Sequence, residues 1–329
     1  MLKDAHNRTI RDLRISLTDR CNFRCFYCLP NGEPPLARKE TILSFEEIVR
    51  VSRIFVSLGI EKIRLTGGEP LIRRDVPSLV AGLAALKPEL KDIALTTNGF
   101  DLPRHAAGLK AAGLDRVTLS LDSVDEKNFE AITGVNALGK VLDAIASAKA
   151  HGFHPVKVNA VIVRGRNDHE ITALADLARR ENIGMRFIEF MPLDSGHEWD
   201  RKQVVSGKEI FTAINERFPL ELIQPNRGSE TAWKYRFADG SPGEIGIIAP
   251  VTEMFCGACS RMRLTADGQI RTCLFSTAEH DLRSVVRSDA SDDEIAGFIR
   301  SVTLQKEARH HINDPAYAPA SRTMSFIGG

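Results

Sequence analysis

Three cysteines within eight residues are the first group in this sequence that could do chemistry. Cys21, Cys25 and Cys28 stand in the segment RCNFRCFYC, residues 20–28. Three thiolates at this spacing can bind three irons of a [4Fe–4S] cluster and leave the fourth iron open to another ligand. A zinc site and buried free cysteines are the alternatives. Structural zinc takes four protein ligands, and the first histidine after the triplet is the distant His105.

A second cysteine triplet stands near the other end of the chain, at Cys256, Cys259 and Cys273. It predicts either a second [4Fe–4S] cluster whose open iron faces a substrate, or a zinc or iron–sulfur site that only stabilises this region. For the structural alternative, His280 is a conceivable fourth ligand.

Two arginines follow the second triplet at alternate positions. Arg261 and Arg263 come two and four residues after Cys259, so in an extended segment they project to the same side. A pair of aligned guanidinium groups suits phosphate oxygens. The pair predicts an anionic ligand beside the second triplet, with a solvated surface pair as the alternative.

Composition restricts the class of protein. The six cysteines fall into two triplets with none left over, and the polar start leads us to expect no secretory leader; both points argue against a disulfide framework in a chain of 329 residues. Lys plus Arg number 44 against 43 Asp plus Glu, so the charge gives no general surface for nucleic acid or membrane. The polar start MLKDAHNRTI and the lack of a run of about 18 apolar residues predict a cytoplasmic protein.

The elements that must position these groups alternate between strand and helix. Short β-branched segments predict strands at 13–18, 62–67, 92–97, 116–121, 156–163 and 185–191. Amphipathic segments between them predict helices at 44–58, 75–86, 137–150 and 168–182. Ser44 and Glu47 have the spacing of a capping box at the start of the first helix. Six successive βα units predict an open parallel sheet or an incomplete barrel.

Side-chain alternation decides between these two folds. Arg14, Arg64 and Lys157 lie on the polar face of their strands, opposite apolar residues such as Leu13 and Ile15. A doubly wound sheet is covered by helices on both faces and reads as almost wholly apolar. We therefore predict an α/β fold, an incomplete (βα)6 barrel of the TIM type, with a polar and basic interior. Ion pairs with interior acids such as Glu69 or Asp122 could satisfy only some of these cations.

The pattern changes after about residue 220. Turn signals there separate short strand-like runs at 231–237, 244–249, 261–265 and 269–274, followed by two helices near 280–287 and 292–307. We expect residues 1–225 to form the barrel with the first cluster. Residues 226–329 would form a smaller β-rich region that carries the second cluster and closes the barrel.

Several motifs together resemble a known family. The spacing of the first triplet, followed by GGEP at residues 67–70 after the second predicted strand, resembles the radical S-adenosylmethionine (SAM) enzymes. The segments LTTNG, SLDS, RFIEFMP, CGACSRMRLTADGQIRTCLF and the terminal GG resemble, more narrowly, the MoaA family of GTP 3′,8-cyclases of molybdenum cofactor biosynthesis. The resemblance extends from about residue 8 to the last residue.

The resemblance implies a radical lyase with two [4Fe–4S] clusters and SAM as cofactors. An electron from the first cluster would cleave SAM to methionine and a 5′-deoxyadenosyl radical, which removes the hydrogen from C3′ of GTP. The C3′ radical would then attack guanine C8 to give 3′,8-cyclo-7,8-dihydro-GTP. The hard chemistry belongs to the cofactors, and the protein provides positioning and a closed chamber.

The resemblance also implies roles for individual residues. It assigns SAM contacts to Tyr27, Gly68, Ser120 and Met191. It assigns GTP contacts to Arg14, Arg64, Thr96, Lys157, Arg261 and Arg263, with Lys62 and Arg186 as weaker candidates for the triphosphate. The tail residues Gly328 and Gly329 would reach into the active site, although chain ends are often frayed and without function.

Expected partners follow from the same resemblance. They are GTP, an electron donor of the flavodoxin or ferredoxin type, the downstream cyclic pyranopterin monophosphate synthase, and a second copy of the chain in a homodimer. Two other functions stay open at this point. One is a peptide-modifying radical SAM enzyme with an auxiliary cluster, although such domains generally carry more than three cysteines. The other is a non-catalytic iron–sulfur electron carrier, which normally ligates every iron.

Overall fold

One twelve-stranded sheet organises the chain. A computed structural model describes residues 1–29, 36–193, 199–315, 317 and 322–328. Six parallel strands form the middle of the sheet in chain order: β1 Asp12–Ser16, β2 Lys62–Thr66, β3 Asp92–Thr97, β4 Arg116–Ser120, β5 Lys157–Ile162 and β6 Gly184–Glu189. All six were predicted from the sequence within a few residues.

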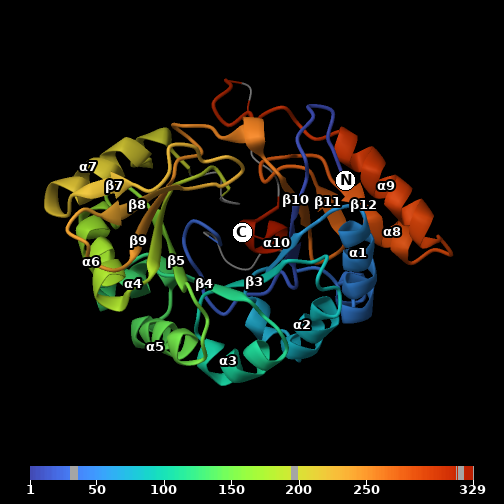
Figure 1. The fold of residues 1–329 in the computed structure, drawn as a ribbon, viewed down its shortest axis with the longest axis horizontal. Helices are drawn as coiled ribbons and strands as arrows, with labels where there is room; N and C mark the ends of the chain where they lie inside the picture. Colours follow the sequence, from blue (N-terminus) through green and yellow to red (C-terminus); the bar gives the residue numbers. More distant parts are fainter. Residues whose placement is uncertain (30–35, 194–198, 316, 318–321, 329) are drawn as a thin grey trace.

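Helices cover the outer face of these strands (Figure 1). They are α1 Phe45–Ser57, α2 Val76–Ala84, α3 Leu102–Ala111, α4 Glu126–Thr133, α5 Leu138–Ala150, α6 Ile171–Glu181 and α7 Gly207–Arg217. The capping box of α1 is present, since Ser44 Oγ accepts from Glu47 N and the Glu47 carboxylate accepts from Ser44 N. The predicted helices are confirmed, and α3, α4 and α7 are additional.

The C-terminal strands extend the same sheet at both edges. They are β7 Leu220–Leu222, β8 Trp233–Phe237, β9 Glu244–Ile248, β10 Arg261–Leu264, β11 Gln269–Arg271 and β12 His280–Asp281. β9 pairs parallel to β6, and β10 pairs parallel to β1. The sheet therefore runs from β12 to β7, and across the described residues no ladder joins these two edges. The predicted incomplete barrel is confirmed.

The open side of the barrel is crossed by loops. The helices α8 Leu282–Val286 and α9 Asp292–Leu304 precede a segment that reaches across, where Asn313 Nδ2 donates to Val251 O at 2.9 Å. Arg8 joins two segments of this wall: its guanidinium donates to the carbonyl of Cys256 (2.9 Å) and to the adjacent carbonyls of Glu307 (2.5 Å) and Ala308 (2.8 Å). The two ends of the chain thus hold the second cysteine loop between them.

The apolar core lies between the strands and the outer helices. Leu13, Ile15 and Leu17 are fully buried there, while Arg14 faces the interior cavity, as the alternation predicted. The short helix α10, Met324–Ile327, lies near the centre of the barrel in Figure 1. No helix among the described residues has the length and apolar character needed to span a membrane.

Candidate active site

Both cysteine triplets face one interior cavity. The cavity has a volume of about 330 Å³ and is enclosed by the polar faces of the strands and by the loops on the open side. All six cysteines line it as free thiols: Cys21, Cys25, Cys28, Cys256, Cys259 and Cys273. Residues separated by more than 200 positions in the sequence thus share one chamber.

The first triplet lies in the loop after β1. The loop is fixed by backbone hydrogen bonds, from Cys28 N to Cys25 O at 2.9 Å and from Arg24 N to Thr133 O at 2.8 Å. Burial, with the neighbouring Cys21, raises the pKa of Cys28 to about 12, and burial raises the pKa of Cys25 as well. Without a cation these three sites hold thiols, so a positively charged metal group is what would stabilise three thiolates here.

The glycines of GGEP let the loop after β2 lie directly on the loop after β1. A Cβ on Gly68 would stand 2.0 Å from the Arg20 carbonyl oxygen, and one on Gly67 would stand 2.6 Å from the Thr18 carbonyl oxygen. Gly68 N donates to Thr18 O at 2.7 Å. Close packing of two backbones is therefore a structural reason for glycine at both positions.

Glu69 is buried, and its carboxylate bonds to the end of β3 and the residue after it rather than to an interior arginine. Its carboxylate accepts from Leu71 N, from Thr97 Oγ1 and from Asn98 N at 2.7–3.0 Å. Burial outweighs these bonds and raises the pKa of Glu69 to about 7. The sequence offers Glu69 and Asp122 as ion-pair partners for the interior arginines. In the described part of the chain neither makes such a pair.

Asp122 connects the loop of the first triplet to β5. Its carboxylate accepts from Tyr27 Oη at 2.5 Å and from Val161 N at 2.8 Å. Burial raises the pKa of Asp122 to about 6 and raises that of Tyr27 well above its ordinary value. Asn167 Nδ2 donates to the Asp122 carbonyl at 2.7 Å, which fixes the backbone of the same residue.

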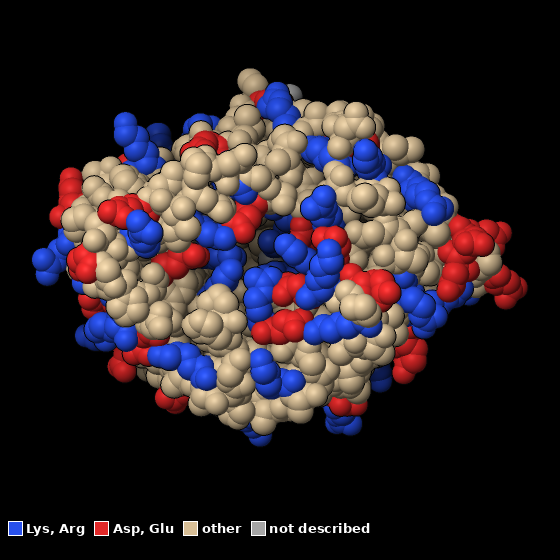
Figure 2. Space-filling model, viewed as in Figure 1, with Lys and Arg blue, Asp and Glu red and all other residues tan. Residues whose placement is uncertain are grey.

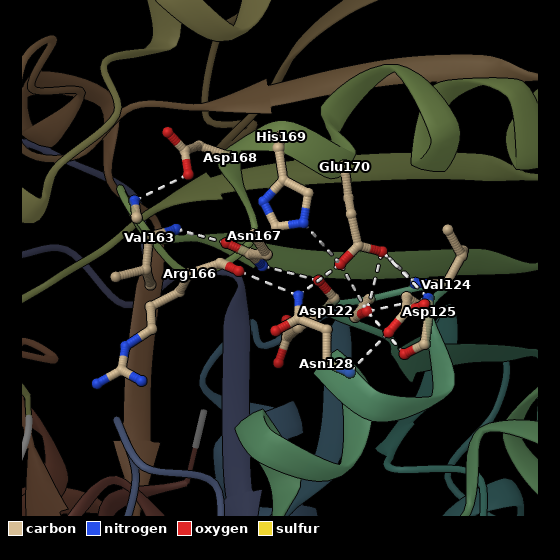
Figure 3. A network of polar contacts seen from close by, with 12 residues as sticks. Asp122, Val124, Asp125, Asn128, Val163, Arg166, Asn167, Asp168, His169 and Glu170 are labelled. Carbon is tan, nitrogen blue, oxygen red and sulfur yellow. Dashed lines mark hydrogen bonds and ion pairs between the residues drawn. The ribbon is translucent and has the colours of Figure 1, made fainter.

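The buried carboxylate of Glu170 holds the loop after β4, which contains Asp122 (Figure 3). Glu170, from the turn before α6, accepts from Ser123 Oγ at 2.7 Å, from Val124 N at 2.7 Å and from Asn128 Nδ2 at 2.5 Å. These bonds hold the loop that follows β4 and contains Asp122. Asn167 and Glu170 were not predicted from the sequence, because Asn167 bonds only to backbone groups and the partners of Glu170 lie more than 40 residues earlier in the chain.

The second triplet lies between the loops of the open side and β10. Cys256 begins a single 3-10 turn, Cys259 follows directly after it, and Cys273 comes two residues after the end of β11. Burial alone would raise the pKa of Cys259, but the nearby charges of Arg261 and Lys306 outweigh it and lower that pKa. His280 lies on β12 and is not among the described lining residues, so the structure does not support it as a fourth ligand.

Two further residues beside this triplet were missed by sequence analysis. Lys306 and His310 both line the cavity and are 4% and 6% exposed. The His310 ring lies against Phe275, with 4.9 Å between ring centroids, and neither ring nitrogen has a hydrogen-bond partner within the described residues. No sequence signal points to either, because both stand in an irregular segment after α9.

The predicted nucleotide-binding cations gather in the barrel. Arg14, Arg64, Arg261 and Arg263 all line the main cavity. Arg64 donates to Thr96 Oγ1 at 3.0 Å. Burial and then neighbouring arginines lower the pKa of Arg64 to about 9 and that of Arg14 to about 10, so both stay charged at neutral pH.

Lys157 occupies a second, smaller cavity at the amino-terminal ends of the strands. This cavity has a volume of about 140 Å³, and Lys62 and Arg116 also line it, while Arg14 and Arg186 reach both cavities. Lys157 therefore lies on the predicted face but outside the main chamber. Lys and Arg side chains rim the central hollow of the molecule (Figure 2).

The tail enters the barrel. Gly328 O accepts from Arg263 Nη1 at 2.5 Å, and a Cβ on Gly328 would stand 2.9 Å from Thr66 Cγ2. Its φ of 82° also favours glycine. Gly329 lies outside the described residues.

The residues predicted to contact SAM lie together. Tyr27, Gly68, Ser120 and Met191 all line the main cavity. They stand on separate segments of the chain, namely the loop after β1, the loop after β2, β4 and the residues after β6. The main cavity thus brings together residues from four separate segments of the chain.

The cysteines fit iron–sulfur clusters better than single metal ions. Across the described residues, no group of three or more His, Cys, Asp or Glu side chains converges closely enough to hold one ion. Thiolates that bind separate irons of a cluster need not converge on one point. The donor set is therefore suitable for a [4Fe–4S] group at the first triplet.

Comparison with known proteins agrees with this site. The Radical SAM superfamily profile matches residues 15–178, and Molybdenum Cofactor Synthesis C matches residues 183–312. A GTP 3′,8-cyclase of Streptomyces coelicolor is 46% identical over 331 residues, covering 100% of this chain and 96% of that protein. One from Mycolicibacterium smegmatis is 46% identical over 334 residues, covering 100% and 92%.

Solved structures agree at the level of the fold. Streptococcus suis SuiB bound to S-adenosylmethionine has a TM-score of 0.65 at 15% identity, covering 93% of this chain and 74% of that one. Native anSMEcpe with bound AdoMet has a TM-score of 0.55 at 13% identity, covering 84% and 80%. At such identities the likeness shows the fold alone. The relatives similar along the whole length decide the family: the chain belongs to the GTP 3′,8-cyclases of the radical SAM superfamily.

Proposed function

We propose that the main cavity binds SAM and GTP side by side, SAM at the first triplet and GTP between the second triplet and the interior cations. As a family member, the chain is a radical SAM lyase that converts GTP to its 3′,8-cyclised product in molybdenum cofactor biosynthesis. The observation that supports the arrangement is the shared cavity, which both cysteine triplets line.

The first triplet and its surroundings would hold SAM. Cys21, Cys25 and Cys28 would hold a [4Fe–4S] cluster with one iron left free of protein ligands, beside which SAM would bind. When bound, this cluster supplies the electron for reductive cleavage of SAM. Contacts to SAM come from Tyr27, Gly68, Ser120 and Met191.

We infer that the hydrogen bonds around Tyr27 and Asp122 prepare the SAM-binding surface before SAM arrives. Asp122 and the Glu170 network fix the Tyr27 ring and the loop after β4, so that SAM meets a preformed surface. Preorganised groups save the entropy that ordering would otherwise cost when the ligand binds.

The second triplet and the cations would hold GTP. Cys256, Cys259 and Cys273 would hold a second [4Fe–4S] cluster, which would offer a binding point to the guanine base. The phosphates and ribose are held by Arg14, Arg64, Thr96, Lys157, Arg261 and Arg263, with Lys62 and Arg186 at the outer end of the triphosphate. Buried arginines that repel one another favour a polyanion, because it offsets the cost of their burial.

The chain's own part in the reaction is positioning and exclusion of water. Holding base and phosphates at separate points keeps ribose C3′ beside guanine C8, the proximity that a cyclisation needs. The loops of the open side and the tail with Gly328 enclose the reacting atoms. Exclusion of water protects a carbon radical from side reactions.

The remaining assignments concern organisation and partners. We propose a barrel region at 1–225 and a closing region at 226–329, a homodimer, a flavodoxin or ferredoxin as electron donor, and product transfer to a cyclic pyranopterin monophosphate synthase. Six free thiols agree with the reducing cytoplasm as the location.

Metal analysis and product detection test the proposal together. Anaerobically reconstituted protein should hold about eight irons, four for each [4Fe–4S] cluster, and should form the cyclised nucleotide from GTP, SAM and dithionite. Replacing Cys21, Cys25 and Cys28 with alanine should remove about half of the iron and all SAM cleavage, while Cys256→Ala with Cys259→Ala should spare SAM cleavage. Undiminished SAM cleavage in the first variant would refute the assignment of that triplet.

A further inference from the structure

Lys306 is a buried lysine in the cavity wall beside the second triplet. The residue is 4% exposed, and its Nζ donates to Arg261 O at 2.9 Å and to Thr272 O. Thr272 directly precedes Cys273, and Arg261 stands two residues after Cys259. The ammonium group is therefore fixed between two segments of the second triplet: the one that carries Cys259 and leads into β10, and the one that carries Cys273 and follows β11.

This positive charge has no carboxylate partner among the residues that the structure describes. Both acceptors of its hydrogen bonds are neutral carbonyls. The adjacent Glu307 carboxylate accepts instead from Thr272 Oγ1 at 2.7 Å. A buried charge without a counter-charge is costly, so its position needs an anion that the protein chain alone does not provide.

Three thiolates are the nearest candidates for that anion. Lys306 Nζ bonds to the carbonyl directly before Cys273 and to the carbonyl two residues after Cys259, so its charge lies beside the two chain segments that carry these thiols. A cluster held by three thiolates is anionic and gains a further negative charge on reduction. Local charge is one of the factors that set the reduction potential of such clusters.

GTP phosphates are the other anion in the proposed cavity. Lys306 is less suited to them, because two carbonyls already hold its Nζ in the wall. The phosphate-binding role also falls to the arginines on the strands and to Lys157 in the smaller cavity.

We propose that Lys306 is the fixed counter-charge of the redox group at the second triplet and raises its reduction potential. This inference rests on the proposed second cluster. Lys306 acts on the cluster only through its electric field and does not bind the iron. Its effect should depend on charge and little on shape.

The test uses full-length protein with Cys21, Cys25 and Cys28 replaced by alanine, so that only the second cluster can form. Lys306→Met removes the charge, Lys306→Gln removes it with a polar replacement, and Lys306→Arg keeps it. Each protein is reconstituted anaerobically, assayed for iron and sulfide, and titrated by electron paramagnetic resonance without GTP. Circular dichroism checks the fold.

The charge-removing variants should be at least tenfold harder to reduce than the parent, which is about 59 mV for a one-electron couple. Lys306→Arg should stay close to the parent. A cluster-loaded Lys306→Met protein with the parent potential would overturn the inference, and so would an equal shift in Lys306→Arg.

Other outcomes are also decisive. Loss of the cluster from both neutral variants, but not from Lys306→Arg, supports the counter-charge. Loss from all three assigns the residue to packing and overturns it. Weaker GTP binding with an unchanged potential would assign Lys306 to the nucleotide instead. A parent protein that takes up no iron would refute the proposed second cluster itself.

Discussion

GTP binding should take up a proton at Lys157. Burial, with the charges of Arg186 and Arg116, lowers the pKa of this lysine to about 7. The side chain lines the smaller cavity at the amino-terminal ends of the strands, where we place the outer part of the triphosphate. Phosphate beside an amine favours its charged form, so the bound nucleotide should return the Lys157 pKa toward its ordinary value.

The size of the effect follows from the two states. A group with a pKa of about 7 is roughly one-tenth protonated at pH 8, so full protonation on binding takes up about 0.9 proton. At pH 6 the free enzyme already carries the proton, and uptake falls to about 0.1. Because the complex binds more protons than the free enzyme, GTP affinity should fall as pH rises above 7, approaching tenfold for each pH unit.

Calorimetry measures this uptake directly. GTP is titrated at pH 6 and pH 8 in two buffers that differ in ionisation enthalpy, and the difference in heat gives the protons exchanged. Lys157→Arg keeps the charge at both pH values and should show little uptake, while Lys157→Met removes both the charge and the uptake. Titration of GTP itself is common to all three proteins and cancels. Parent uptake near zero at pH 8, or equal uptake in Lys157→Met, would refute the reasoning.

Three further changes test other parts of the structure. Arg64→Ala should weaken GTP binding by about 1.5–3 kcal/mol at constant iron content and SAM affinity; unchanged GTP affinity by calorimetry would contradict its role. Gly328→Ala should lower turnover but not iron content, because φ is 82° and the new Cβ would meet Thr66 at 2.9 Å; parental turnover would show that the tail position does not matter. Arg8 Nε forms a buried ion pair with the Asp4 carboxylate at 2.6 Å. Arg8→Met should therefore reduce the free energy of unfolding by about 3–5 kcal/mol, since it leaves the buried Asp4 carboxylate without its counter-charge. Urea denaturation measures this against Arg8→Lys, and a loss below about 1 kcal/mol would contradict it.

Sequence periodicity predicted the central strands and the face on which each side chain lies. Alternation placed Arg14 and Arg64 in the interior, because strand geometry leaves only two faces and burial chooses between them. It placed Lys157 on the right face as well. Alternation has no information about depth, however, and Lys157 is the first residue of its strand, so it lies in the smaller cavity.

The parts that sequence reasoning missed depend on which distant segments meet. β10 was predicted as a strand, but nothing in RMRL indicates that it pairs parallel to β1 rather than within a separate sheet. Glu170 bonds mainly to a loop more than 40 residues earlier, and Lys306 bonds only to backbone carbonyls. Such partners leave no pattern in the spacing of side chains.

The pairing of β1 with strands from both ends of the chain has a consequence for protein synthesis. β2 pairs with β1 in register from Lys62, but the other neighbour starts at Arg261. At typical translation rates, the ribosome needs roughly 10–40 s to make the residues in between. During that interval one edge of β1 has no partner, and an open strand edge favours association with other chains. The loop of the first triplet is made early, but the chamber around it is completed only when the last residues have been made. We therefore expect the growing chain to depend on chaperones more than the completed protein does.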